Sequence, residues 1–132
     1  MKTELVYLVY STVLTGLMWT PYIVNRLLVR GISATTGYSD HPKPQSPWAQ
    51  RLMKAHANAV ENLVIFAALV LTASVAGIST PAIALAATVY FWARVVHALA
   101  YTFAVPWVRT AGFLVGVGAQ VDIAVQLLTH AA

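Results

Sequence analysis

Four polar side chains stand at the entrance to an apolar run, with a spacing that could hold a small charged ligand. Arg51, Lys54, Asn58 and Glu61 occur at positions i, i+3, i+7 and i+10. On a helix these positions share one face, where two cations, an amide and a carboxylate would face a zwitterion together. The alternative is a helix end at the lipid headgroups, whose cations contact phosphate. It explains Arg51 and Lys54 better than Asn58 and Glu61.

A second polar stripe, in a later apolar segment, consists of Tyr90, Arg94, His97 and Tyr101. They share one helical face at positions i, i+4, i+7 and i+11. A charge at bilayer depth needs a partner, and Glu61 and Asp122 are the carboxylates expected to be deep enough to pair with Arg94. The alternative is structural: Arg94 and a carboxylate lock helices together, His97 joins two helices by a hydrogen bond, and the tyrosines only pack.

The pair Arg109-Thr110 follows Pro106-Trp107 at the predicted start of the last helix. A cation, a hydroxyl group and free backbone amides meet there, and together they favour an anion such as a thiolate. An arginine that only anchors the helix end at the membrane surface is the alternative. The chain has no cysteine, so a thiol would have to come from a ligand. No zinc site is expected, because the four histidines show no metal-binding spacing.

The composition predicts that these stripes lie in a membrane. Of the 132 residues 59% are hydrophobic and only 9% are charged, and the mean hydropathy is +0.71. We predict an all-α integral membrane protein, a four-transmembrane-helix up-down bundle in a single domain over residues 1–132. The predicted spans cover residues 5–29, 48–78, 82–105 and 107–129, with a loop at 31–47. The cations are dispersed along the chain, which argues against nucleic-acid binding.

Prolines and glycines suggest how the spans begin and pack. Ser46 and Pro47 favour a helix start, with the hydroxyl group of Ser46 as a cap. Pro21 is expected to kink the first span. Gly112 and Gly116 are spaced for close contact with another helix, although this signal is weak by itself.

The charge distribution predicts the orientation. The connection between the first two spans is flanked by Arg26, Arg30, Lys43, Arg51 and Lys54. Arg109 lies at the same side, whereas the opposite side has Lys2 alone. Cations concentrate on the cytoplasmic side of membrane proteins, so we expect the basic loop in the cytoplasm and the termini in the periplasm or lumen.

Two segments resemble the MAPEG family, the membrane-associated proteins in eicosanoid and glutathione metabolism. The segment Lys54-Ala-His56-Ala-Asn58-Ala-Val-Glu61-Asn62 resembles the basic-Ala-His-x-Asn-x-x-Glu-Asn signature of the microsomal glutathione transferase branch. The segment from Arg94 through His97 to Tyr101 is similar to one shared with microsomal prostaglandin E synthase. The resemblance extends over nearly the whole chain. It implies a homotrimer with glutathione bound between subunits on the cytoplasmic side.

The resemblance also assigns roles to residues. Glutathione would be held by Lys54, Asn58, Glu61, Arg94, His97 and Tyr101, with contributions from Arg26, Arg30 and Arg51 at the basic rim. Arg109 resembles the arginine that stabilises the glutathione thiolate, and Thr110 stands where the prostaglandin synthase has a serine. Lys54 replaces a common arginine and loses its two-pronged grip on a carboxylate. His97 in place of tyrosine argues against the leukotriene synthase branch.

The implied function is a glutathione-dependent membrane transferase, or a related peroxidase, acting on a lipophilic electrophile in a detoxification role. The expected location is a bacterial inner membrane, with glutathione and a lipophilic small molecule or lipid as partners. Two other functions are open. One is a non-catalytic scaffold of the same fold that binds lipid or glutathione. The other is a small ion or proton carrier that uses Glu61, Arg94 and Asp122 as a relay.

Overall fold

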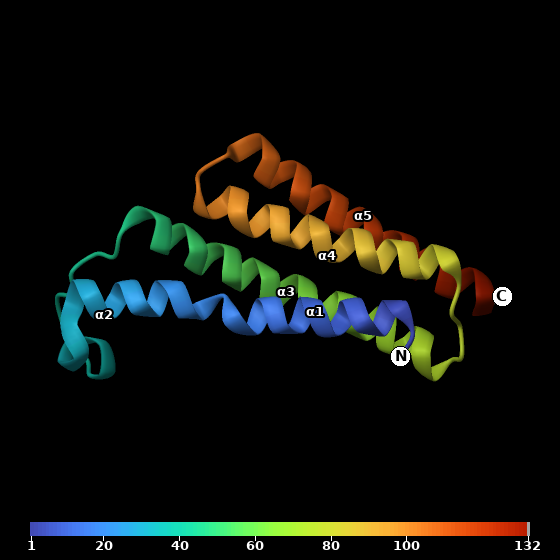
Figure 1. The fold of residues 1–132 in the computed structure, drawn as a ribbon, viewed down its shortest axis with the longest axis horizontal. Coiled ribbons are helices and arrows are strands. Elements are labelled where there is room, and N and C mark those ends of the chain that lie inside the picture. Colours follow the sequence, from blue (N-terminus) through green and yellow to red (C-terminus); the bar gives the residue numbers. More distant parts are fainter. Residues whose placement is uncertain (132) are drawn as a thin grey trace.

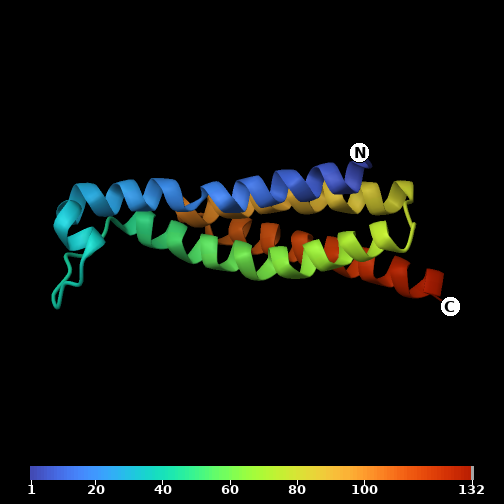
Figure 2. The same cartoon turned by 90° about the horizontal axis from the view of Figure 1, so that it is seen from below.

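Five helices make up the computed structural model, which describes residues 1–131. They are α1 (Thr3–Leu17), α2 (Trp19–Thr36), α3 (Pro47–Val75), α4 (Pro81–Thr102) and α5 (Pro106–Ala131). They form an elongated bundle in which α1 and α2 follow one another end to end beside α3, while α4 and α5 form a hairpin (Figure 1). Both termini lie at the same end of the bundle (Figure 2).

The first predicted span is divided where a proline disturbs the helix. α1 ends at Leu17, and Met18 separates it from α2. Pro21 has no amide proton, and its ring crowds the carbonyl group four residues earlier, at Leu17. Met18 keeps near-helical angles, with φ −62° and ψ −24°, so α1 and α2 stay almost in line (Figure 2).

The predicted loop at residues 31–47 starts too early. α2 continues to Thr36, with one non-helical residue inside it, Gly31, at φ 81° and ψ 171°. Glycine reaches this left-handed region without strain, which lets the chain bend there and form a further helical turn. The connection to α3 is therefore limited to residues 37–46.

Proline opens α3 as expected, but the predicted serine cap is wrong. Pro47 occupies the first turn, while the side chain of Ser46 caps no backbone amide. Its hydroxyl oxygen instead accepts a hydrogen bond of 2.8 Å from the side-chain amide of Asn25 on α2. Ser46 thus ties two helices together. At the start of α4, in contrast, the hydroxyl oxygen of Thr80 accepts from the Ile83 amide at 3.1 Å.

The turn between α4 and α5 contains a backbone conformation that alanine rarely adopts. Ala104 has φ 59°, in the left-handed region, and the Val105 amide donates back to the Ala100 carbonyl at 2.8 Å. The turn after α3 is closed in the same way around Gly77, at φ 71°. Glycine is the usual residue at such helix ends, so Ala104 is strained by roughly 1–2 kcal/mol.

Many large apolar side chains lie on the surface, which indicates a membrane setting. Within residues 1–131, α3, α4 and α5 are the three helices long and apolar enough to cross a bilayer. Large side chains such as Leu28, Val64 and Leu114 are exposed in the subunit. The chain is an integral membrane protein. Its main core cluster is drawn from four helices and contains Leu8, Phe66, Val70, Ala86, Ala87, Tyr90, Ala119 and Ile123.

Small residues let α4 and α5 approach each other closely, as their spacing predicts. A Cβ atom added to Gly112 would lie 3.2 Å from the carbonyl oxygen of Ala93 and 3.2 Å from the backbone nitrogen of His97. One added to Gly116 would meet the Arg94 side chain at an ordinary 3.5 Å. Gly112 therefore brings α5 against the α4 turn that carries both Arg94 and His97.

Candidate functional site

Arg94 lies inside the bundle, and its partner there is an amide. The residue is 4% exposed, and its Nη2 atom donates to Oδ1 of Asn58 on α3 at 2.6 Å. The expected ion pair with Glu61 or Asp122 is therefore not the contact that this subunit makes. An amide oxygen carries only a partial charge, so it orients the guanidinium group without neutralising it.

The two carboxylates face elsewhere. Glu61 is exposed on the subunit surface. Asp122 is exposed on α5, where its Oδ2 atom accepts from Gln126 at 2.7 Å, and Gln126 in turn accepts from Thr80 at 2.9 Å. Asp122 thus belongs to the end of the bundle that carries the α3–α4 turn, a structural position away from Arg94.

A chain of amides supports Asn58 from behind. The side-chain nitrogen of Asn62 donates to Asn58, at 2.9 Å to the backbone oxygen and 3.3 Å to Oδ1. Gln120 on α5 then donates to the backbone oxygen of Asn62 at 3.0 Å. Asn62 and Gln120 are 7% and 5% exposed. One buried relay thus runs from α5 through α3 to Arg94 on α4.

Among residues 1–131, three buried nitrogen atoms at this place have no hydrogen-bond partner. They are Nε and Nη1 of Arg94 and Nδ1 of His97. His97 is 3% exposed, with its ring edge-on to Tyr101 at 5.6 Å. A buried donor without an acceptor costs about 1–3 kcal/mol, and more when it is charged. The arrangement therefore favours an anionic or polar ligand against Arg94.

A pocket opens beside this cluster at the end of α4. Its volume is about 190 Å³, and its lining includes Arg51, Tyr101 and Arg109. Arg51 is anchored by a 2.9 Å hydrogen bond from Nε to the carbonyl oxygen of Thr102. The Arg109 guanidinium lies over the Tyr101 ring, with Cζ 4.7 Å from its centre. Ala104, the strained residue of the α4–α5 turn, also lines the pocket. The turn sets where α5 begins and therefore where Arg109 lies.

Three further predicted site residues, Lys54, Glu61 and Thr110, lie outside this pocket. Lys54 and Glu61 are exposed on α3, so the outer part of the first stripe faces away from the subunit core. Thr110 is also exposed, and its hydroxyl group donates to the Pro106 carbonyl at 3.1 Å within α5. These three side chains can complete a site only at the subunit surface.

Arg26 and Arg30 lie in a different pocket. Together with residues of the loop and the first turns of α3, they line a hollow of about 320 Å³ that shares no residue with the pocket of Arg51 and Arg109. Residues of α2, the loop and α3 line this hollow, whereas the other pocket is lined by Arg51 of α3 and by residues at the end of α4 and the start of α5. Within one subunit the predicted basic rim is therefore divided.

An apolar groove runs along the outside of α4 and α5. Its volume is about 440 Å³, and its lining includes Trp92, Val96, Val108 and Gly112. Val108 and Ala111, which also line it, flank Arg109 and Thr110 in sequence. A lipophilic molecule in this groove would thus end close to the polar pocket.

Comparison with known proteins gives a family match. The sequence model of the MAPEG family matches residues 6–129. The chain belongs to the MAPEG family. No curated protein and no solved structure matches the chain. In this MAPEG protein the match includes α2 to α4 entirely and most of α1 and α5, so both polar stripes lie inside it.

Gln120 contributes to the site but is not predicted by the sequence patterns. Gln120 completes the relay to Arg94, yet it belongs to neither polar stripe. A signal was present, because Gly112, Gly116 and Gln120 follow one another at intervals of four and so share the face that packs on α4. Asn62 was part of the recognised motif, but its role in holding Asn58 depends on contacts that a sequence does not display.

Proposed function

We propose that this MAPEG protein is a glutathione-dependent membrane transferase that activates the glutathione thiol for attack on a lipophilic electrophile, with peroxidase activity as a related reaction. The observation that carries the proposal is the buried Arg94 guanidinium, held by Asn58 on one side and unpartnered at Nε and Nη1. Glutathione offers two carboxylates, an ammonium group and a thiol. These groups match the cations and the carboxylate of the two stripes.

The binding roles follow from the charges. Arg94 and Arg51 pair with carboxylates of the tripeptide, and His97 and Tyr101 supply polar contacts at the same face of α4. Asn58 orients Arg94. Lys54 and Glu61 lie on the exposed side of α3, where they meet a ligand bound between two subunits, and Glu61 takes the ammonium group. Arg26 and Arg30 line another pocket of the same subunit, so in this proposal they contribute to the site from the basic rim of a neighbouring subunit.

Arg109 supplies the catalytic function in this proposal. A guanidinium group near the sulfur favours the thiolate, so the thiol pKa falls below its usual value of about 8.5 and its proton passes to solvent. The thiolate then forms a bond from sulfur to the electrophilic atom of the second substrate. Either a leaving group departs from that atom with its bonding electrons, or an activated double bond opens and its electron pair takes a proton from solvent. Thr110 stands next to Arg109 at the start of α5, where free backbone amides add to the positive potential.

The assembly that we propose is a homotrimer in which each subunit spans the membrane four times. α1 and the first part of α2, which lie end to end, together form the first span (Figure 1). The basic loop faces the cytoplasm of a bacterial host, in keeping with its excess of cations. The electrophile reaches Arg109 from the bilayer through the apolar groove of α4 and α5.

Calorimetric titration of glutathione into the detergent-solubilised protein tests the proposal. Glutathione is expected to bind at a site that S-methylglutathione, which keeps both carboxylates and the ammonium group, also occupies. Lack of binding by both compounds would overturn the proposal and leave the lipid-binding scaffold as the better account. Proton transport without thiol binding, measured in vesicles with a pH-sensitive dye, would favour the carrier.

A further inference from the structure

The apolar groove of α4 and α5 continues past the part described above and ends at a carboxylate. A second hollow of about 390 Å³ is lined by residues that include Ala86, Ala119 and Asp122, and Val89 lines both hollows. On α5 the lining residues from Val108 to Asp122 recur at intervals of three or four, so they form one stripe along the helix. The two hollows therefore belong to one long groove on the outer face of the α4–α5 hairpin.

The two ends of this groove differ in their chemistry. One end lies beside Arg109, because the preceding residue, Val108, lines it. Asp122, at the other end, lies thirteen residues further along α5, which is a distance of about 20 Å along the helix axis. Apart from Thr88 and Trp92, the lining residues between these ends are apolar. Among residues 1–131, no lysine, arginine or histidine lines either hollow, so the carboxylate has no opposite charge within the groove.

The Asp122 side chain can accept a further partner. Its Oδ2 atom accepts from Gln126 at 2.7 Å, which is its one side-chain hydrogen bond within residues 1–131. A carboxylate has about four acceptor positions, so Oδ1 is available to another donor. An ionisable side chain within a membrane-spanning helix is costly unless it meets a polar or oppositely charged group. The end of the groove is therefore built around a missing donor.

A neighbouring subunit is a poor source of that donor. In a closed assembly, subunits with one membrane orientation present each residue at the same depth, so a neighbour brings no new side chain to the level of Asp122. The basic side chains at this end lie further out, since Lys2 precedes α1 and His130 is in the last turn of α5. Arg94 is buried and donates to Asn58. A ligand is the remaining source of a positive charge.

We propose that the α4–α5 groove selects, as the second substrate, an elongated lipophilic molecule with an ammonium head group. The ammonium group binds Asp122, and the apolar chain lies along the groove toward Arg109. A lipophile with a carboxylate head is disfavoured there, because like charges repel and no cation of the groove offsets them. This inference deepens the proposed function, since it rests on the groove being the path of the electrophile. Binding of the head group itself does not require glutathione.

Three matched amphiphiles, added to the detergent-solubilised protein, test the inference by native mass spectrometry. Hexadecylamine, hexadecanol and hexadecanoic acid share one chain length and differ in the head group. We expect the wild type to bind the amine at least about tenfold more tightly than the acid, with the alcohol between them. Asp122→Asn keeps an acceptor for Gln126 but loses the charge, so its affinity for the amine should fall about tenfold. Asp122→Glu keeps the charge and should retain most of the preference.

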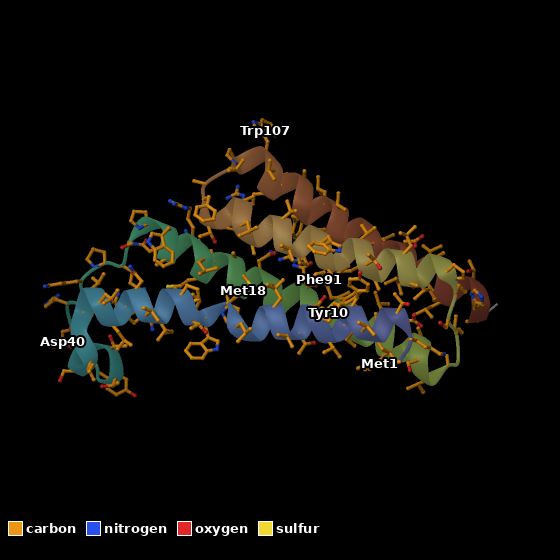
Figure 3. The ribbon with its side chains drawn as sticks, in the orientation of Figure 1. Met1, Tyr10, Met18, Asp40, Phe91 and Trp107 are labelled. Carbon is orange, nitrogen blue, oxygen red and sulfur yellow. The ribbon has the colours of Figure 1, made fainter. Side chains whose placement is uncertain are left out.

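Two further variants separate the end of the groove from its length. Asp40→Asn is the matched control, because it removes a carboxylate from the loop at the opposite end of the bundle, and its preference should equal that of the wild type (Figure 3). Val89→Phe narrows the place where the two hollows join. It should weaken hexadecylamine binding and leave butylamine binding unchanged, because butylamine fills the hollow of Asp122 alone.

Several outcomes would overturn the inference. One is equal affinity of the wild type for the amine and the acid, and another is an undiminished amine preference in Asp122→Asn. Tighter amine binding by Lys2→Gln would assign the carboxylate to a contact between subunits and would also overturn it. Titration with glutathione separates this inference from the proposed function. Glutathione binding without amine preference overturns the inference alone, whereas an amine preference that depends on Asp122, in a protein that binds no glutathione, supports the head-group site and overturns the transferase.

Discussion

Arg94 is the residue on which the polar interior of this protein depends. Its positive charge is buried, and within residues 1–131 the side-chain oxygen of Asn58 is the one acceptor of its hydrogen bonds. A buried cation with two free donor atoms is unfavourable in the empty subunit, because the desolvation of its charge is not compensated. The same feature becomes an advantage when a carboxylate of a ligand arrives. Affinity and stability are thus expected to be linked at this residue.

Glu61 and Asp122 should differ sharply when their charges are removed. Glu61→Gln is expected to weaken glutathione binding by about 1.5–3 kcal/mol, roughly 10- to 150-fold, because it loses a charge-assisted contact with the ammonium group. Asp122→Asn is the matched control, since Asp122 contacts Gln126 on its own helix. Isothermal titration of both variants measures the difference. Equal and small losses would show that Glu61 has no part in binding.

At the scale of single residues, the sequence indicated the polar stripes but not the partners. Helical spacing places Arg94, His97 and Tyr101 on one face, and in the structure Arg94 and His97 are buried. The sequence could not identify Asn58, and not Glu61, as the contact of Arg94. That choice depends on how α3 is rotated about its own axis relative to α4. Sequence spacing within one helix carries no information on that rotation.

The relay from α5 to α4 makes a prediction at the scale of elements. Gln120→Leu removes the hydrogen bond to Asn62 and loosens the support of Asn58 and Arg94. Glutathione affinity should fall about two- to tenfold, in line with one lost buried hydrogen bond. Gln120→Glu keeps an acceptor but loses the donor, so it should not restore affinity.

The control for the relay is Gln126→Leu, which makes the same substitution at another glutamine of α5, on a different face of the helix. Gln126 contacts Thr80 and Asp122, so this substitution should affect thermal stability and not glutathione affinity. Titration calorimetry together with thermal unfolding separates the two effects. An equal loss of affinity in both variants would mean that the relay has no special role in positioning Arg94.

The contact between α4 and α5 predicts opposite results for two glycines. Gly112→Ala puts a methyl group 3.2 Å from the Ala93 carbonyl oxygen, so the helices must separate, at a cost of about 1–3 kcal/mol. Gly118→Ala meets nothing within 4 Å and should be neutral or stabilising by up to about 1 kcal/mol, because alanine is the better helix former. Thermal unfolding in detergent measures both. Matching stabilities would contradict the packing.

The sequence was more informative for the last three helices than for the first two. Pro47, Pro81 and Pro106 mark the starts of α3, α4 and α5, since proline fits the first helical turn and hardly any later one. Hydropathy alone merged α1 with part of α2, because apolar side chains continue through the break at Met18. The extra turn of α2 depends on the backbone angles of Gly31, which composition does not determine.

At the scale of the whole molecule, the exposed charges of α3 predict assembly. Lys54 and Glu61 lie on the subunit surface of a helix that is apolar enough to cross the membrane. Charges facing lipid are costly, by about 2.5–3.5 kcal/mol each near the bilayer centre, and a second subunit or a ligand would remove that penalty. We therefore expect subunits to assemble, and the family resemblance implies a trimer with the thiol sites at its subunit boundaries.

Native mass spectrometry of the detergent complex tests this expectation. The predicted result is a predominant species of three chains that binds up to three glutathione molecules. A monomer that binds glutathione with full affinity would contradict it. No feature of one subunit could supply the stoichiometry, because the surface that forms the contacts is the same apolar surface that faces lipid.

The central claim is that bound glutathione is held as a thiolate by Arg109. Its most direct test is the ultraviolet absorbance of the thiolate, followed against pH in the glutathione complex of the wild type. Deprotonation is expected well below the pKa of about 8.5 of an ordinary thiol. Arg109→Leu should return the pKa toward that value and lower turnover, with affinity nearly unchanged. Bound glutathione that forms no more thiolate than free glutathione at the same pH would contradict the account.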